Sequence, residues 1–149
     1  MGADRGLKVC LEWLPWCGVP TIKSAWELIQ EAGSDNIGLV VDTWHWLRQP
    51  GGPDLDTLRQ IPGERIHCVQ LDDTTATGTG EDLFVESTTN RMLPGDGEVD
   101  WTSLLSALDE IGADPIWSPE VFNLGLLEEG PLEMAKKTRA ATRKVLGLS

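Results

Sequence analysis

Tyrosine is absent from this sequence, and histidine and cysteine are scarce: the 149 residues include two histidines and three cysteines. The cysteines, Cys10, Cys17 and Cys68, are odd in number and form no Cys-x-x-Cys pair. This pattern predicts small buried apolar side chains in a reducing compartment rather than a disulfide framework.

Long apolar runs are also missing. No segment approaches the roughly 20 apolar residues that a bilayer-spanning helix needs, so we expect no membrane span. Residues 1–11 do not place a charged segment before a long apolar one. We therefore expect no signal peptide and a cytoplasmic location.

Basic residues are few. Lysine and arginine total 12 against 24 aspartates and glutamates, which gives a formal net charge of −12. A surface this acidic repels nucleic acid and anionic membranes, so neither is expected as a partner. Part of the negative charge could instead surround a bound cation. Apolar residues make up 40% of the chain, which predicts a single folded domain over residues 1–149.

Tryptophan, by contrast, is abundant, with seven residues. Trp13, Trp44 and Trp46 flank acidic or imidazole side chains, which suggests a cleft with apolar walls. Trp26 and Trp101 fall within helical patterns, and we predict that they are core residues.

The chain repeats one unit four times: an apolar run, a polar residue at its end, a loop and an amphipathic helix. Strands are predicted at 7–11, 37–41, 65–69 and 115–119, and helices at 22–32, 55–60, 101–111 and 131–146. The second strand shows no polar alternation, so both of its faces should be buried, as in a parallel sheet covered by helices. Residues 74–98 form the longest irregular stretch and are expected to be functional or disordered.

This alternation predicts an α/β fold with parallel strands. Two architectures are compatible with it, a doubly wound open sheet and part of a barrel. The glycine fingerprint expected after the first strand of a dinucleotide-binding fold is missing, which weighs against the open sheet.

Each predicted strand ends at a residue with side-chain oxygen: Glu12, Asp42, Gln70 and Glu120. The carboxyl ends of parallel strands share one edge of the sheet, so these groups should point into one space. Carboxylates gathered there repel each other unless a cation lies between them. Oxygen ligands without thiolate favour Mg²⁺ or Mn²⁺ over zinc. The sequence therefore predicts a divalent-metal site.

The two histidines have different surroundings. His45 follows Asp42 by three residues, just beyond the strand end, and we predict that it contacts substrate or transfers a proton. His67 lies within an apolar strand and is predicted to be structural. The basic cluster on the last helix is predicted to be a solvated face, with no binding role.

Taken together, five segments resemble the xylose isomerase-like (β/α)₈ barrel superfamily. They are Leu11-Glu12, Asp42-Thr43-Trp44-His45, Val69-Gln70-Leu71-Asp72-Asp73, Arg91-Met92-Leu93-Pro94-Gly95-Asp96-Gly97 and Pro119-Glu120-Val121-Phe122. The resemblance covers nearly the whole chain and corresponds to the second half of the barrel, from its fifth strand to its eighth helix. It implies that Glu12, Asp42, Gln70 and Glu120 occupy the metal-ligand positions. The family more often has histidine at the position of Gln70, and some dehydratase-like members have glutamine.

The resemblance also implies roles for other residues. His45 and Arg91 match substrate-contacting positions, and Glu86 and Asp73 are weaker candidates for supporting or substrate-binding roles. Glu12 or Glu120 is the expected catalytic base, with His45 as a further catalytic group. The endonuclease IV branch needs several histidines to hold three metals, and the two histidines and the acidic charge of this chain rule it out.

The implied function is a metal-dependent isomerase or epimerase that acts on a sugar or polyol-derived ketone through an enediolate. One alternative is a dehydratase of the inosose or 3-dehydroshikimate type, which Gln70 favours. Another is an inactive half-barrel that serves as a binding or assembly partner. A closed barrel needs eight strands, and this chain supplies four. We expect a homodimer, association with a complementary half-barrel chain, or a fragment of a longer protein.

Overall fold

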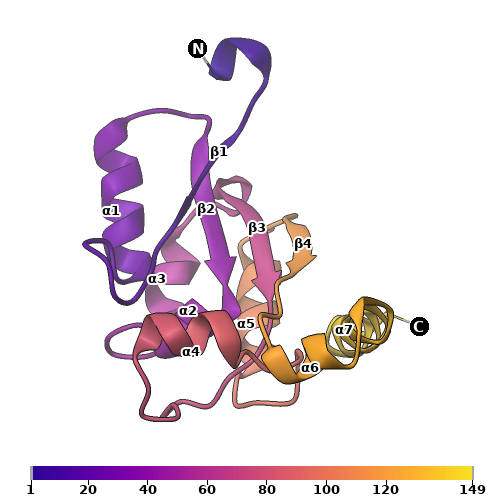
Figure 1. Cartoon of the computed structure of the whole chain (residues 1–149). Helices are drawn as coiled ribbons and strands as arrows, with labels where there is room; N and C mark the ends of the chain where they lie inside the picture. Colours follow the sequence, from indigo (N-terminus) through magenta and orange to yellow (C-terminus); the bar gives the residue numbers. More distant parts are fainter. Residues whose placement is uncertain (1, 149) are drawn as a thin grey trace.

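The computed structural model describes residues 2–148 and contains one sheet of four parallel strands in the order β1-β2-β3-β4. The strands are β1 (Val9–Glu12), β2 (Ile37–Asp42), β3 (Ile66–Leu71) and β4 (Ile116–Pro119). They run in one direction, and their carboxyl ends point toward the helices α2 and α4 (Figure 1). The predicted α/β fold with parallel strands is therefore confirmed.

The four predicted helices are present as α1 (Ile22–Ala32), α3 (Leu55–Gln60), α5 (Trp101–Glu110) and α7 (Pro131–Val145). Three short helices were not predicted: α2 (Thr43–Arg48), α4 (Leu83–Thr89) and α6 (Leu124–Glu128). The prediction of an irregular stretch over 74–98 was wrong where α4 forms. Each of the three spans fewer than eight residues and begins at an N-cap side chain, from Asp42, Asp82 and Asn123 respectively.

Two further single turns of 3-10 helix lie at η1 (Ala3–Arg5) and η2 (Gly63–Arg65). In residues 2–148, no helix combines the length and the hydropathy needed to cross a membrane.

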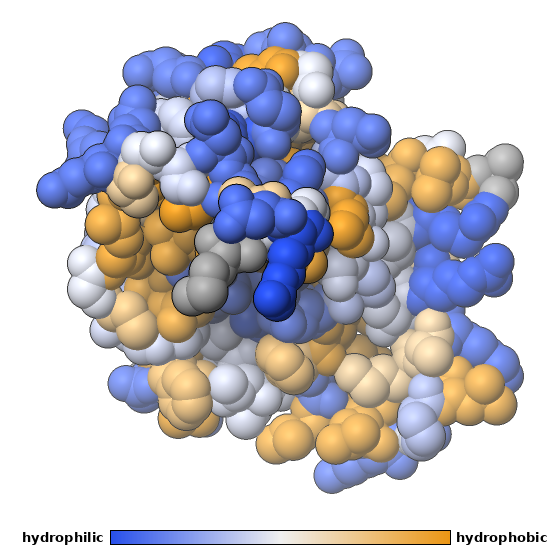
Figure 2. All heavy atoms as spheres, turned by 90° about the horizontal axis from the view of Figure 1, so that it is seen from above, coloured by the Kyte–Doolittle hydropathy of each residue, from blue (hydrophilic) through white to orange (hydrophobic). Residues whose placement is uncertain are grey.

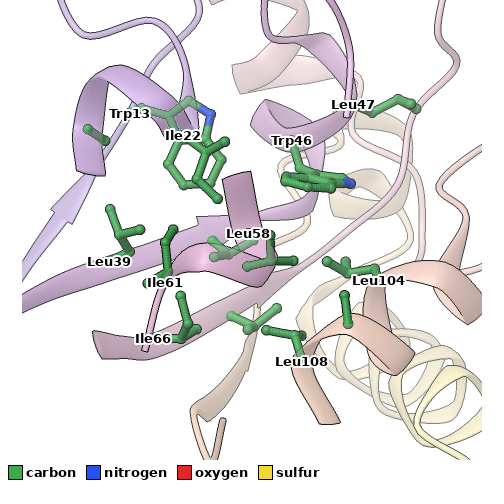
Figure 3. Close-up of a cluster of buried hydrophobic side chains, with 14 of the residues drawn as sticks. Trp13, Ile22, Leu39, Trp46, Leu47, Leu58, Ile61, Ile66, Leu104 and Leu108 are labelled. Carbon is green, nitrogen blue, oxygen red and sulfur yellow. The ribbon is translucent and has the colours of Figure 1, made fainter. Parts of the chain in front are cut away.

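The core lies between one face of the sheet and the helices α1, α3 and α5. Ile22, Leu58 and Leu104 point from these helices toward Leu39 and Ile66 of the sheet (Figure 3). Alternate strand residues on this face are buried because the helices cover them.

The opposite face of the sheet is more open. Val40 and Cys68 on this face are only partly buried, and Cys10 is exposed. On this face of β2, Gly38 and Asp42 are buried and Val40 is intermediate, so the prediction that both faces of β2 are buried is confirmed in part. The predicted burial of the cysteines was wrong, since Cys10 and Cys17 are exposed and Cys68 is intermediate.

Apolar side chains are exposed at both edges of the sheet. Val9 on β1 is 47% exposed and Ile116 on β4 is 72% exposed. Viewed from the end at which the strands begin, hydrophobic side chains form several groups between hydrophilic ones (Figure 2). Unpaired, apolar edges are surfaces on which a further strand can pair.

A capping box fixes the start of α1. Thr21 Oγ1 accepts the backbone N–H of Ser24, and Ser24 Oγ accepts the backbone N–H of Thr21. We expect Thr21→Ala to lower the free energy of unfolding by about 1 kcal/mol, because one N–H of the first turn loses its partner. Urea unfolding measures this loss. Thr102→Ala is the control, because Thr102 is an exposed helical residue, and it should change stability by less than about 0.5 kcal/mol. Equal losses in the two variants would contradict the capping assignment.

Candidate functional site

The ends of the four strands bring the predicted ligand residues to one edge of the sheet. Glu12 and Asp42 are the last residues of β1 and β2, and Glu120 directly follows β4. In the strand register Asp42 lies opposite Gln70. The parallel topology therefore places these side chains on one edge, as their positions in the repeated unit predict.

Glu12, Asp42 and His45 form a compact group. Each of the three offers one ligand atom, and these atoms all lie within 4.8 Å of one another. Asp42 sets the position of His45, because its Oδ1 caps α2 by accepting the His45 backbone N–H at 2.9 Å. The imidazole Nε2 then lies 3.4 Å from Glu12 Oε1.

Gln70 and Glu120 form the other side of the site. Gln70 Nε2 donates to Glu120 Oε1 at 3.0 Å. The remaining amide oxygen, Gln70 Oε1, is buried and has no hydrogen-bond partner. A buried oxygen without a donor is costly, and a cation satisfies it.

Arg91 joins the two sides of the site. Its Nη1 donates to Asp42 Oδ2 at 2.6 Å and to Glu120 Oε2 at 3.2 Å, and it also contacts Asp72. The guanidinium is buried, and Arg91 Nε donates a hydrogen bond to the backbone oxygen of Ser87 at 2.8 Å. Arg91 was predicted to contact substrate, and in this structure it is a counter-ion inside the acidic group.

No role was predicted for Asp72, which is fully buried and contacts this arginine. Thr43 Oγ1 donates to Asp72 Oδ1 at 2.6 Å, and the Arg91 guanidinium contacts its other oxygen. A signal was present in the sequence, because Asp72 lies at the end of the third apolar run and directly follows β3, as Glu120 directly follows β4. Gln70 was predicted instead because it directly follows the strand predicted at 65–69.

The close packing of carboxylates shifts their proton affinities. Burial raises the pKa of Asp72 well above its usual value, and the nearby charge of Asp42 raises it further. Burial also raises the pKa of Glu120, although Arg91 acts in the opposite direction. Burial alone would lower the pKa of Arg91, but the Asp42 and Asp72 carboxylates outweigh it and raise that pKa.

These residues fit a divalent cation. The carboxylates of Asp42, Asp72 and Glu120 contact a single guanidinium, and Glu12 lies beside Asp42, so negative charge remains in excess. The unpartnered oxygen of Gln70 adds a neutral ligand at the same edge. Oxygen-rich groups of this kind suit hard divalent ions.

Asp73 and Glu86 are buried, and protein donors occupy their oxygens. Asp73 accepts the backbone N–H groups of Thr74, Gly95 and Val99 and the indole N–H of Trp101. Glu86 forms a two-oxygen ion pair with Arg48. These contacts anchor a loop and a helix beside the site.

The tryptophan prediction was wrong in part. Trp13, Trp44 and Trp46 are buried, and Trp13 and Trp46 belong to the hydrophobic core. Trp16, for which no role was predicted, lies next to His45, and Phe84 lies next to Trp16.

His67 was predicted to be structural. Its Nδ1 lies at hydrogen-bond distance, 3.8 Å, from the sulfur of Cys10, and burial lowers the pKa of its ring, in agreement with that prediction.

The chain resembles several known proteins. It is 35% identical over 140 residues to an inosose isomerase of Bacillus subtilis (strain 168), covering 89% of this chain and 48% of that protein. It is 34% identical over 122 residues to a 3-dehydroshikimate dehydratase of Pseudomonas putida, covering 81% of this chain and 19% of that protein. The chain spans about half the length of the inosose isomerases it matches.

Solved structures show a similar relationship. A crystal structure of the IolI protein with a bound zinc atom superposes with a TM-score of 0.82 at 30% identity, covering 95% of this chain and 50% of that one. An L-ribulose 3-epimerase superposes with a TM-score of 0.67 at 23% identity, which shows a shared fold. The model of one family, the xylose isomerase-like TIM barrel, matches residues 1–145. With its four parallel βα units, the chain therefore belongs to the xylose isomerase-like TIM barrel family.

Proposed function

We propose that this chain is the metal-binding half of an isomerase or epimerase that acts on a sugar or polyol-derived ketone through an enediolate. One observation carries the proposal: ligand atoms of Glu12, Asp42 and His45 lie within 4.8 Å of one another at the edge of the sheet that also holds Glu120 and the unpartnered amide oxygen of Gln70. The similarity to inosose isomerases supports it.

Glu12, Asp42, Gln70 and Glu120 are the proposed ligands. A divalent ion bound there supplies Lewis-acid polarisation of a carbonyl and the neighbouring hydroxyl. The oxygen donors favour Mg²⁺ or Mn²⁺. A related structure binds zinc, so the metal content of the purified protein decides between these ions.

The carboxylates are the proposed proton acceptors. Glu12 or Glu120 accepts the proton from the carbon next to the carbonyl, and the raised pKa of Glu120 favours it as the acceptor. His45 Nε2, at 3.4 Å from Glu12 Oε1, orients that carboxylate or exchanges a proton with it. Return of the proton to a different carbon gives isomerisation, and its return to the other face of the same carbon gives epimerisation.

Arg91 is proposed to contact substrate oxygens as well. Its Nη1 already contacts three carboxylates, so it reaches a substrate only by giving up one of these partners. Asp73 and Glu86 are proposed to support the site through the loop and helix that they anchor.

The open edges of the sheet require a partner for a closed barrel. We propose that β1 and β4 pair with strands of a second copy or of a complementary half-barrel. Two copies would bring two acidic sites to the same end of one barrel. The charge repulsion between these two sites favours pairing with a complementary half-barrel over pairing with a second copy.

A second candidate function is dehydration of a polyol ketone. Two observations favour it: the amide of Gln70 at a ligand position and the similarity to 3-dehydroshikimate dehydratases. The first step, proton removal next to a carbonyl, is the same, and a β-hydroxyl is then expelled as water.

Proton exchange tests the step that both functions share. We expect the Mg²⁺-loaded protein in D₂O to replace the hydrogen next to the carbonyl of an inosose with deuterium, as followed by ¹H NMR. Protein treated with a chelator is the control and should show only the slow background exchange. A conjugated product that absorbs ultraviolet light identifies dehydration. Proton exchange without such a product identifies isomerisation. No exchange above background despite bound metal, both with this chain alone and with a complementary half-barrel chain added, would contradict both enzymatic functions in favour of an inactive half-barrel.

A further inference from the structure

Cys10 and His67 form a thiol–imidazole pair nearer the beginning of the strands than the acidic group. Cys10 is the second residue of β1, and His67 is the second residue of β3. Cys10 Sγ lies 3.8 Å from His67 Nδ1, at hydrogen-bond distance for sulfur. The thiol is exposed, whereas the histidine is buried, with 7% of its surface exposed. An accessible nucleophile therefore lies next to a base that the fold holds in place.

Gly38 allows the two side chains to meet across β2. This strand lies between β1 and β3, and Gly38 is opposite Cys10 in the strand register. A Cβ atom at Gly38 would lie 2.6 Å from both Cε1 and Nε2 of His67, so the imidazole occupies the space that a side chain would fill. A larger residue at this position would move the ring away from the thiol.

His67 can accept the thiol proton. Burial lowers the pKa of its ring, and the charge of Lys8 lowers it further, so the imidazole is uncharged near neutral pH. In the tautomer that carries its proton on Nε2, Nδ1 is the acceptor for the S–H of Cys10. Loss of this proton during attack makes the sulfur a stronger nucleophile.

The other two cysteines lack such a partner. Cys17 is exposed in the loop between β1 and α1, and Cys68 is only partly exposed. Within residues 2–148, neither of these thiols lies at hydrogen-bond distance from an imidazole. Because β2 separates Cys10 from Cys68, their strands lie about 9–10 Å apart, beyond the roughly 7 Å that a disulfide can bridge.

The surroundings of Cys10 favour an uncharged, partly apolar reagent. An anionic reagent such as glutathione disulfide would meet Glu12, two residues along the strand on the same face, in a chain with a net charge of −12. Cys10 also borders a cavity of about 220 Å³ beside α1, and the other residues that line it are apolar: Val9, Leu11, Leu28, Ile29, Ala32 and Ile37.

We propose that Cys10 is a covalent modification site for uncharged α,β-unsaturated aldehydes, with His67 as the base and the apolar cavity as the binding place of the alkyl tail. The Cys10 sulfur forms a bond to the β-carbon of the alkene, and the π electrons of the alkene shift toward the carbonyl. The thiol proton passes to His67 Nδ1 and then to the α-carbon, so the addition needs no leaving group and no oxidant. This inference does not rest on the proposed function.

Mass spectrometry of the chain treated with trans-2-hexenal tests this site. Cleavage after Glu12 separates Cys10 from Cys17, so the rate of adduct formation is measured at both thiols in one sample. We expect Cys10 to react roughly 10-fold faster than Cys17, because a positioned base assists its attack. His67→Gln should remove this difference while Cys17 keeps its rate. Acrolein, which has no alkyl tail, should give a smaller ratio between the two rates.

Equal rates at Cys10 and Cys17 in the unmodified protein would overturn the proposal, as would an unchanged Cys10 rate in a folded His67→Gln variant. The first comparison keeps the test available if His67→Gln does not fold. The same ratio with acrolein as with trans-2-hexenal would contradict the role of the cavity. Faster modification of Cys10 by glutathione disulfide than by trans-2-hexenal would contradict the class of reagent. Cys10→Ser is the control for the assignment, because its peptide 1–12 should carry no thiol adduct.

Discussion

Asp42→Asn is expected to weaken Mg²⁺ or Mn²⁺ binding by at least about 100-fold while the fold persists. The substitution removes the charge of a fully buried proposed ligand in the acidic group. Its amide oxygen can still cap α2, as Asp42 Oδ1 does for the His45 backbone N–H. The charge of Asp42 also raises the pKa of Asp72, so its removal relieves repulsion inside the site.

Isothermal titration calorimetry measures the affinity, and a thermal melt checks the fold. Asp100→Asn is the matched control, because Asp100 also caps a helix, accepting the Ser103 backbone N–H at 3.0 Å, but is exposed and outside the acidic group. It should bind the metal as the unmodified protein does. Equal affinity in Asp42→Asn and Asp100→Asn would remove Asp42 from the metal site.

Asp73→Ala is expected to lower the free energy of unfolding by about 3–5 kcal/mol. Asp73 is fully buried, and its two oxygens accept four N–H groups at 2.9 to 3.0 Å. Gly95 belongs to the turn at 94–97, Trp101 is the first residue of α5, and Val99 lies between them, so the carboxylate joins these segments to the end of β3, where Thr74 lies. Without it, Gly95, Val99 and Trp101 all lose a charged partner.

Urea unfolding gives the size of the effect. Asp96→Ala is the control, since Asp96 is an exposed residue of the same turn, and it should change stability by less than about 0.5 kcal/mol. A loss below 1 kcal/mol in Asp73→Ala would show that the four hydrogen bonds contribute little and would leave the substrate role as the better account of this residue.

The strand ends were predictable because their signal is repeated. Four apolar runs each end at an oxygen-bearing residue, and parallel pairing brings such ends together whatever the loops do. Glu12, Asp42, Gln70 and Glu120 consequently lie at one edge, as expected. Their role as metal ligands stays a prediction until a metal is measured.

The contacts of Arg91 could not be read from the sequence. Nothing in its spacing says that its guanidinium lies among Asp42, Asp72 and Glu120, because these residues are 19 to 49 positions away along the chain. Its position depends on α4, a short helix within the stretch predicted to be irregular.

The tryptophans show a second limit of prediction from the sequence. Trp13 and Trp46 stand next to polar residues in the sequence, yet they belong to the core that the helices cover. Sequence neighbours point to opposite faces of a strand, so adjacency to Glu12 indicated the wrong side for Trp13. Cys10 and Cys68 were misjudged because they lie on the more open face of the sheet, and Cys17 because it lies in the loop between β1 and α1.

The position of a bound metal tests the central claim most directly. Crystals of the protein grown with Mn²⁺ give an anomalous diffraction signal that locates the ion. We predict one ion in direct contact with Glu12, Asp42, Gln70 and Glu120, with Arg91 displaced from at least one carboxylate. Crystals that hold no Mn²⁺ at this edge of the sheet, at concentrations that saturate binding in solution, would contradict the account.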